Sequence, residues 1–239
     1  MAEVALEKAE RLKQLPTYLF VELDRAKRAL EAKGHDVINL GVGDPDLPTP
    51  APIRERLAAE ADNPANHRYS TTEAQRELPE AIARWFARRF QVTLDPATEI
   101  LPLLGSKEGI AHLPLVLANP GDVVFVPDPG YPPYSSGTRL AGAEVVWMPL
   151  REEGGFFPDL GAISQRAARR AKLMFLNYPN NPTAAVASLE QLRQAVALAK
   201  GYQFALAHDA AYSEVAFDGF QPASLLQVPD AKDVAVEFH

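Results

Sequence analysis

The chain of 239 residues carries 24 lysines and arginines and 31 aspartates and glutamates, and this net charge of −7, without a basic cluster, argues against nucleic-acid binding. Its length fits one large α/β domain or two small ones, and the absence of cysteine excludes a disulfide scaffold, a thiolate zinc site and a cysteine nucleophile. No apolar run reaches the roughly 18 residues of a membrane-spanning helix, and residues 1–14 lack a signal-peptide core, so we expect a cytoplasmic protein without a metal site.

The first expected elements are one or two exposed helices within residues 1–34, which form an N-terminal arm. Beyond them, short β-rich runs alternate with amphipathic helices. Several of the runs, such as Val123–Val126, are almost wholly apolar, which is typical of strands buried on both faces of a parallel sheet. The predicted strands are Asp36–Leu40, Glu99–Leu104, Asp122–Val126, Glu144–Met148, Leu173–Asn177, Gln203–Ala207 and Val234–Phe238.

Amphipathic helices are predicted between these strands at Glu80–Phe90, Ser106–Ala118 and Ser188–Lys200. In the last of them, Ser188 and Gln191 have the spacing of a capping box, and Gly201 is expected to end the helix. Pro114 is expected to kink the second. Strands that alternate with helices of this length indicate right-handed crossovers and a doubly wound sheet.

Ligands of such sheets bind beyond the carboxyl ends of the strands, where unusual residues of this chain follow two predicted strands. Gly105, Ser106 and Lys107 open a helix, where free amides and a positive charge can bind an anion, although a simple turn and N-cap explain them equally well. Tyr131 lies between Gly130 and Pro132, which favours a rigid ring for stacking on an aromatic ligand, or an aromatic side chain packed on its own loop.

Two later strand ends carry polar side chains. Asn180 and Asn181 lie between prolines, so Asn181 is either an oriented hydrogen-bond donor or part of an ordinary turn. Asp209 ends an apolar strand three residues before Tyr212, and it either meets a cationic partner or serves as a helix N-cap. Taken together, the four strand ends fit a flat, phosphorylated heteroaromatic molecule with a basic ring nitrogen and a phenolic oxygen, which describes pyridoxal 5′-phosphate.

Several stretches of the chain also match the motifs of one enzyme family. They are residues 15–20, 41–46, 67–69, 103–110, 127–132, 177–183 and 208–212. On these residues the chain resembles the class I and II aminotransferases of pyridoxal-phosphate fold type I, most closely the LL-diaminopimelate aminotransferase group. The resemblance implies an aspartate-aminotransferase-like α/β/α fold with a mostly parallel sheet. It also implies an N-terminal arm and small-domain segment at 1–48 and an incomplete cofactor-binding domain at 49–239.

The resemblance assigns a role to individual residues. It implies that pyridoxal 5′-phosphate has its phosphate on Gly105, Ser106 and Lys107, its ring under Tyr131, its phenolic oxygen on Asn181 and Tyr212, and its ring nitrogen on Asp209. Tyr69 resembles a residue that reaches the cofactor phosphate of the other subunit in a homodimer. The implied substrate contacts are Tyr18, Gly43, Lys107, Tyr131 and Asn181.

The chain departs from the family pattern at four points. Ala74 and Ala184 stand where the family usually has glycine, and Pro79 stands where it has arginine. If Ala184 adopts a positive φ, we expect a strain of roughly 1 kcal/mol. The catalytic Schiff-base lysine of the family is absent from the chain and is expected after His239, so the chain is interpreted as the N-terminal part of a longer protein.

The full-length protein is therefore expected to move an amino group between an amino acid, such as LL-diaminopimelate, and a 2-oxo acid, such as 2-oxoglutarate. Two alternatives remain open at this point. One is another fold type I enzyme, such as a C–S lyase, because a fold does not determine a reaction. The other is a lysine-free fragment that binds pyridoxal phosphate weakly or acts as an interface.

Overall fold

A computed structural model describes residues 7–15, 19–41, 43, 46–70 and 76–239. The chain forms two compact units, Met1–Gln14 with Leu78–His239, and Leu15–Glu77. The short helix α1 (Glu10–Lys13) belongs to the larger unit and the longer α2 (Leu19–Glu31) to the smaller one, and both are largely exposed. The exposed helices expected within residues 1–34 are thus present, whereas their role as an N-terminal arm stays a prediction. The smaller unit also contains α3 (Ala51–Ala61) and a 3-10 helix at Pro64–His67. The domain division at residues 48 and 49 stays a prediction.

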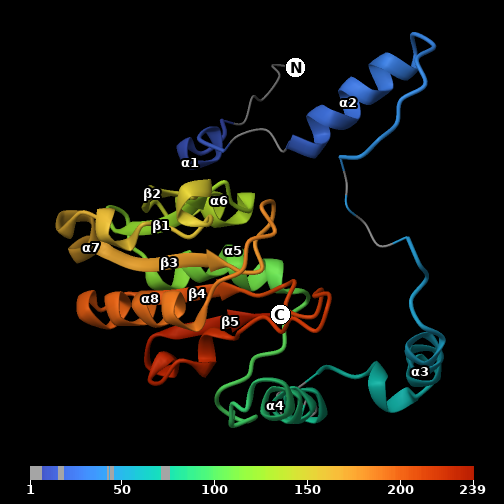
Figure 1. Ribbon diagram of the computed structural model, residues 1–239. Helices are drawn as coiled ribbons and strands as arrows, with labels where there is room; N and C mark the ends of the chain where they lie inside the picture. Colours follow the sequence, from blue (N-terminus) through green and yellow to red (C-terminus); the bar gives the residue numbers. More distant parts are fainter. Residues whose placement is uncertain (1–6, 16–18, 42, 44–45, 71–75) are drawn as a thin grey trace. The chain divides into compact units, whose positions relative to one another are not determined.

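The larger unit is built on a parallel sheet of five strands, shown in Figure 1. The strands are β1 (Val123–Asp128), β2 (Glu144–Pro149), β3 (Ala171–Asn177), β4 (Ala205–Asp209) and β5 (Ala235–Phe238). They lie in the order β2-β1-β3-β4-β5. The chain thus proceeds from β1 toward one edge and from β3 toward the other, so a switch point lies between β1 and β3. Doubly wound sheets bind their ligands at such a point.

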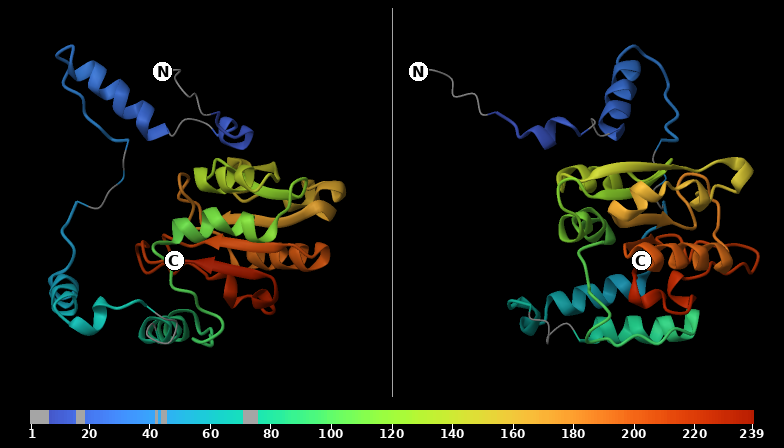
Figure 2. Two further views of the ribbon diagram at one scale, coloured as in Figure 1. Left: turned by 180° about the vertical axis from the view of Figure 1, so that it is seen from behind. Right: turned by 90° about the vertical axis from the view of Figure 1, so that its left-hand side faces the viewer.

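Helices cover both faces of the sheet, as Figure 2 shows. The helices α5 (Ser106–Leu117) and α6 (Pro132–Leu140) lie on one face, and α8 (Leu189–Tyr202) lies on the other. Side chains alternate along each strand: Val124 and Val126 belong to the core under α5 and α6, whereas Val123 and Phe125 belong to the core under α8. This three-layer arrangement confirms the predicted α/β/α fold.

For α8, the capping box predicted at its start is confirmed, but the end predicted at Gly201 is wrong. Ser188 and Gln191 form the expected capping box, with the Gln191 N–H donating to the Ser188 hydroxyl at 3.2 Å. The helix continues through Gly201 and ends where Gln203 adopts a left-handed conformation with φ of 62°. Gly201 therefore does not end the helix, because the left-handed residue that follows its last turn lies two positions later.

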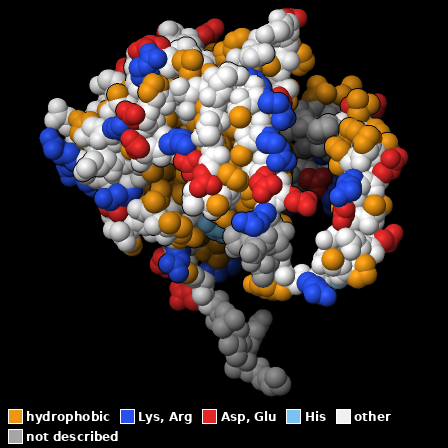
Figure 3. All heavy atoms as spheres, turned by 90° about the horizontal axis from the view of Figure 1, so that it is seen from below, with side chains coloured by type: hydrophobic (Ala, Val, Ile, Leu, Met, Phe, Trp, Pro, Cys, Tyr) orange, Lys and Arg blue, Asp and Glu red, His pale blue; other side chains and the backbone are white. Residues whose placement is uncertain are grey.

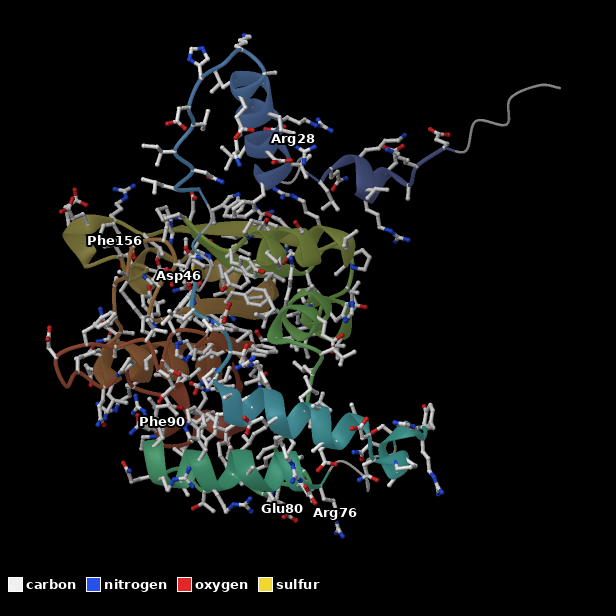
Figure 4. The ribbon with its side chains drawn as sticks, turned by 90° about the vertical axis from the view of Figure 1, so that its right-hand side faces the viewer. Arg28, Asp46, Arg76, Glu80, Phe90 and Phe156 are labelled. Carbon is white, nitrogen blue, oxygen red and sulfur yellow. The ribbon has the colours of Figure 1, made fainter. Side chains whose placement is uncertain are left out.

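The remaining helices border the sheet. α4 (Glu77–Phe90) buries Phe86 and Phe90 in a small core with Val92 and Leu94. Figure 4 shows Phe90 on the side of α4 that faces the rest of this unit and the exposed Glu80 on the opposite side. The short α7 (Gln165–Arg170) leads directly into β3.

Two of the predicted strands do not form. Residues 36–40 and 99–104 have no strand conformation. Several of their apolar side chains are exposed, with Leu40 at 91% and Leu104 at 95%, whereas Ile100 is half-buried against the small core of Phe86 and Phe90. In the second segment Pro102 also lacks the N–H group that a ladder requires.

The surface carries charges of both signs. On the face that Figure 3 displays, acidic and basic side chains are interspersed. Among the described residues, no helix has both the length and the apolar character needed to cross a membrane.

Candidate functional site

The site begins with two strand ends that lie side by side. Asn177, the last residue of β3, is paired in register with Asp209, the last residue of β4. On the other side of β3, β1 leads through a short turn to Tyr131, the N-cap residue of α6. The topology therefore brings residues from three strand ends to the predicted edge of the sheet, next to the switch point.

Asp209 is the buried charge of this edge, with only 6% of its surface exposed. Its Oδ2 accepts a hydrogen bond of 2.7 Å from the Tyr134 hydroxyl, while its Oδ1 has no partner among the described residues. Burial raises the pKa of Asp209 above its usual range, and the Tyr134 hydrogen bond opposes that increase. The residues that follow form a turn and not a helix, so Asp209 is not a helix N-cap.

Tyr134 was not identified from the sequence, yet it organises the centre of the site. Its fully buried ring stacks on Phe175, with centroids 4.7 Å apart and planes at 18°. Burial, followed by the negative charge of Asp209, raises the pKa of Tyr134 above its ordinary value, so the hydroxyl stays protonated and donates.

Tyr131 links this centre to the start of α5. Its half-buried ring meets the Tyr134 ring edge-on, with centroids 5.7 Å apart. The Lys107 ammonium lies 5.9 Å from the centroid of the Tyr131 ring. The Tyr131 ring therefore both contacts its own helix and stays partly accessible to a ligand.

The first turn of α5 has the features of an anion-binding site. Gly105 is the N-cap with φ of 82°, and no side chain caps the helix from that position. Ser106 is the first helical residue and is half-buried, so it is not the N-cap. Glu108 accepts a hydrogen bond of 2.8 Å from the Leu104 N–H. The helix dipole and Lys107 favour an anion here.

The loop after β3 is held by side-chain amides. The Asn177 side chain donates to the Asp209 carbonyl at 2.8 Å and accepts from the Asn181 N–H at 2.8 Å. The Asn180 oxygen accepts from the Thr183 hydroxyl at 2.7 Å. Ala184 has φ of 59°, so the condition for the strain of roughly 1 kcal/mol is met. Asn177 was named from the sequence only as the end of a strand, and a polar residue closing an apolar run is the signal that could have identified it.

The remaining predicted site residues fall into three groups. Tyr212 lies in the turn after β4 and is 39% exposed. Tyr69, 93% exposed, and Gly43 lie in the unit Leu15–Glu77, so their roles stay predictions. Tyr18 and Ala74 lie outside the described residues.

A second polar cluster lies on the strand pair β4 and β5. The buried Glu237 carboxylate bonds to His208 Nδ1 and to His239 Nε2, each at 2.8 Å, and also accepts from the Ser224 hydroxyl at 2.7 Å. Burial alone would raise the pKa of Glu237, but its hydrogen bonds with the two histidines hold it below the ordinary value. No local sequence pattern marks this cluster, because the β4–β5 register brings His208 beside Glu237 from 29 positions away.

Burying the Asp209 Oδ1 atom without a hydrogen bond costs free energy, so this edge of the sheet is suited to a ligand that donates a hydrogen bond. A protonated aromatic nitrogen at Asp209, a ring at Tyr131 and a phosphate at the start of α5 would together satisfy these groups. The residues present therefore fit pyridoxal 5′-phosphate. The fold and the site define an α/β protein whose groups at the carboxyl ends of its strands suit a planar anionic cofactor.

Comparison with known proteins gives the family. The model of the aminotransferase class I and II family matches residues 35–237. The LL-diaminopimelate aminotransferase of Syntrophobacter fumaroxidans is 53% identical over 236 residues, which cover 99% of this chain and 61% of the relative. The chain belongs to the class I and II aminotransferases.

Solved structures agree with this assignment. Substrate-bound BacF from Bacillus subtilis superposes with a TM-score of 0.91 at 42% identity, over 98% of this chain and 59% of that one. An aspartate aminotransferase variant from Thermus thermophilus gives a TM-score of 0.81 at 28% identity, over 94% of this chain and 58% of that one. The fold is therefore aspartate-aminotransferase-like, as predicted, and the chain spans about three fifths of the length of these relatives.

Proposed function

We propose that this chain belongs to a pyridoxal-phosphate-dependent aminotransferase that moves an amino group between LL-diaminopimelate, or a related amino acid, and a 2-oxo acid such as 2-oxoglutarate. The observation that carries the proposal is the buried Asp209 carboxylate, whose Oδ1 lacks a partner in the described part of the chain. Relatives named LL-diaminopimelate aminotransferase, at 53% and 50% identity, support the substrate class.

Each residue around Asp209 contacts a different part of the cofactor. When bound, pyridoxal 5′-phosphate supplies an aldehyde that takes up the amino group and an electron-poor ring that stabilises negative charge at the substrate Cα. Asp209 keeps the proton on the ring nitrogen, because a nearby carboxylate favours the cationic form. Tyr131 stacks on the ring, and Asn181 and Tyr212 donate hydrogen bonds to the phenolic oxygen.

The other contacts follow from the same proposal. Gly105, Ser106 and Lys107 bind the phosphate through helix amides, a hydroxyl and an ammonium group. Tyr18, Gly43, Lys107, Tyr131 and Asn181 contact the substrate.

The proposed assembly is a cytoplasmic homodimer in which Tyr69 reaches the phosphate of the other subunit. Its large exposure within its own unit leaves Tyr69 free for such a contact. We expect the Schiff-base lysine of the family in the part of its relatives that this chain does not span.

The test compares Asp209→Ala with Asp128→Ala. Asp128 also ends a strand of the sheet, but its side chain is exposed. Asp209→Ala should reduce amino transfer from LL-diaminopimelate to 2-oxoglutarate by several orders of magnitude in the full-length protein, whereas Asp128→Ala should retain it. Circular dichroism checks that both variants are folded. Near-normal turnover by folded Asp209→Ala would contradict the proposed role.

A further inference from the structure

The bonding of Asn177 distinguishes it from the other polar residues of its loop. Its side chain is 97% buried, and both ends of its amide are used. The Nδ2 group donates to the backbone carbonyl of Asp209 at 2.8 Å, and Oδ1 accepts from the backbone N–H of Asn181 at 2.8 Å. A single side chain therefore connects the strand end that carries the buried carboxylate to the loop that carries Asn181.

This connection lies where the backbone ladder ends. Parallel pairing between β3 and β4 ends at Asn177 and Asp209. Two residues beyond Asn177, Pro179 has no N–H to donate to a ladder. At this end of the sheet the Asn177 amide donates an N–H to the Asp209 carbonyl, and its Oδ1 accepts from the backbone of the loop.

We propose that Asn177 is a positioning residue that sets the separation between Asn181 and Asp209, and thereby lets both contact one cofactor molecule. This inference rests on the proposed function, in which Asn181 serves the phenolic oxygen and Asp209 the ring nitrogen. These two atoms are held at a fixed separation by one rigid ring. If Asn181 moves relative to Asp209, the ring cannot keep good hydrogen bonds to both residues.

Asn180 provides a matched control in the same loop. It is equally buried, at 4% exposure, but its amide does not bond to Asp209. Its oxygen accepts from Thr183, and its Nδ2 donates to the Asn177 carbonyl at 3.2 Å and to Asn177 Oδ1 at 3.5 Å. Asn177→Asp and Asn180→Asp each introduce one carboxylate and keep an acceptor oxygen. Only Asn177→Asp removes the donor to Asp209 and places an oxygen against its carbonyl.

The experiment measures pyridoxal-phosphate affinity by equilibrium dialysis and the pH midpoint of the absorption change of the bound cofactor. Unfolding midpoints without cofactor monitor the fold. Asn177→Asp should weaken binding by about tenfold, comparable to the loss of one hydrogen bond. It should also raise the pH midpoint, because a displaced Asn181 no longer favours the ionised phenolic oxygen. Asn180→Asp should change neither quantity appreciably.

Two results would overturn the inference. One is an unchanged affinity and pH midpoint in folded Asn177→Asp. The other is an equal loss in both variants, which would show a structural role for the whole loop. If Asn177→Asp does not fold, Asn177→Ser and Asn180→Ser are compared in the same way. If the unmodified protein does not bind pyridoxal phosphate, the proposed function itself fails, so the two failures are distinguishable.

Discussion

Removing the Tyr134 hydroxyl is a direct test of how Asp209 is held. The substitution Tyr134→Phe keeps the ring that stacks on Phe175 but removes the donor of the 2.7 Å hydrogen bond to Oδ2. Because Oδ1 has no partner in the described chain, the carboxylate then loses the side-chain donor that offsets its burial. A hydrogen bond to a charged group contributes about 1.5–3 kcal/mol, so the free energy of unfolding at pH 7 should fall by roughly this amount.

The effect should depend on pH with a defined sign. The hydrogen bond stabilises ionised Asp209, so its removal raises the pKa of Asp209 further above the usual range. The difference in stability between wild type and Tyr134→Phe should therefore be largest where Asp209 is ionised and should shrink as pH falls and the carboxyl becomes protonated. Urea unfolding measures this difference in stability, and it is carried out below pH 9 so that the Tyr134 hydroxyl stays protonated.

Tyr178→Phe is the matched control. Tyr178 is also buried and stacks on Phe157, but its hydroxyl donates to the uncharged Phe156 carbonyl at 2.7 Å. We expect a loss of about 0.5–1.5 kcal/mol that does not vary with pH over the same range. A loss in Tyr134→Phe that is equally independent of pH would refute the reasoning, because Asp209 would then not be ionised against that hydroxyl.

Three further predictions concern the rest of the chain. Glu237→Gln should lower the free energy of unfolding by about 3 kcal/mol at pH 7. The histidine hydrogen bonds hold the pKa of Glu237 below its ordinary value, so this stabilisation is present above about pH 4.5 and is lost as pH falls. Acid titration should therefore narrow the difference in unfolding free energy between wild type and Glu237→Gln. A difference that stays constant with pH would contradict this prediction. Gly137→Ala places a Cβ 2.5 Å from the Ala111 carbonyl and should destabilise by about 1–3 kcal/mol in urea unfolding, whereas Gly201→Ala, with open space, should be neutral or stabilising. Borohydride reduction of the 239-residue chain with pyridoxal phosphate should give no stoichiometric adduct by mass spectrometry, and an adduct on one lysine with measurable amino transfer would overturn the placement of the catalytic lysine after His239.

The strands of the sheet could be predicted where burial on both faces makes the sequence continuously apolar. The run Val123–Val126 is apolar because both of its faces are covered, and this pattern identifies a strand without knowledge of its neighbours. The runs 36–40 and 99–104 are also rich in apolar residues, but a strand also needs a partner strand, which the composition of the run does not reveal. In the second run, Glu99 instead bonds to Lys232 and to the Asp95 N–H.

The site could be predicted only in part for a similar reason. Asp209 and Tyr131 follow apolar strands, so their position on the sheet edge was evident from the sequence. Their partners were not, because Tyr134 reaches Asp209 across 75 positions and Asn177 reaches it across 32. Such contacts depend on strand order and register, which local sequence patterns do not encode.

The central claim is that the Asp209 edge binds pyridoxal 5′-phosphate, and a crystal structure of the protein grown with this cofactor tests it most directly. The account predicts the ring nitrogen about 3 Å from Asp209 Oδ1, with the phosphate at the first turn of α5 next to Ser106. A cofactor whose ring nitrogen lies away from Asp209, or whose phosphate lies away from Ser106, would contradict it.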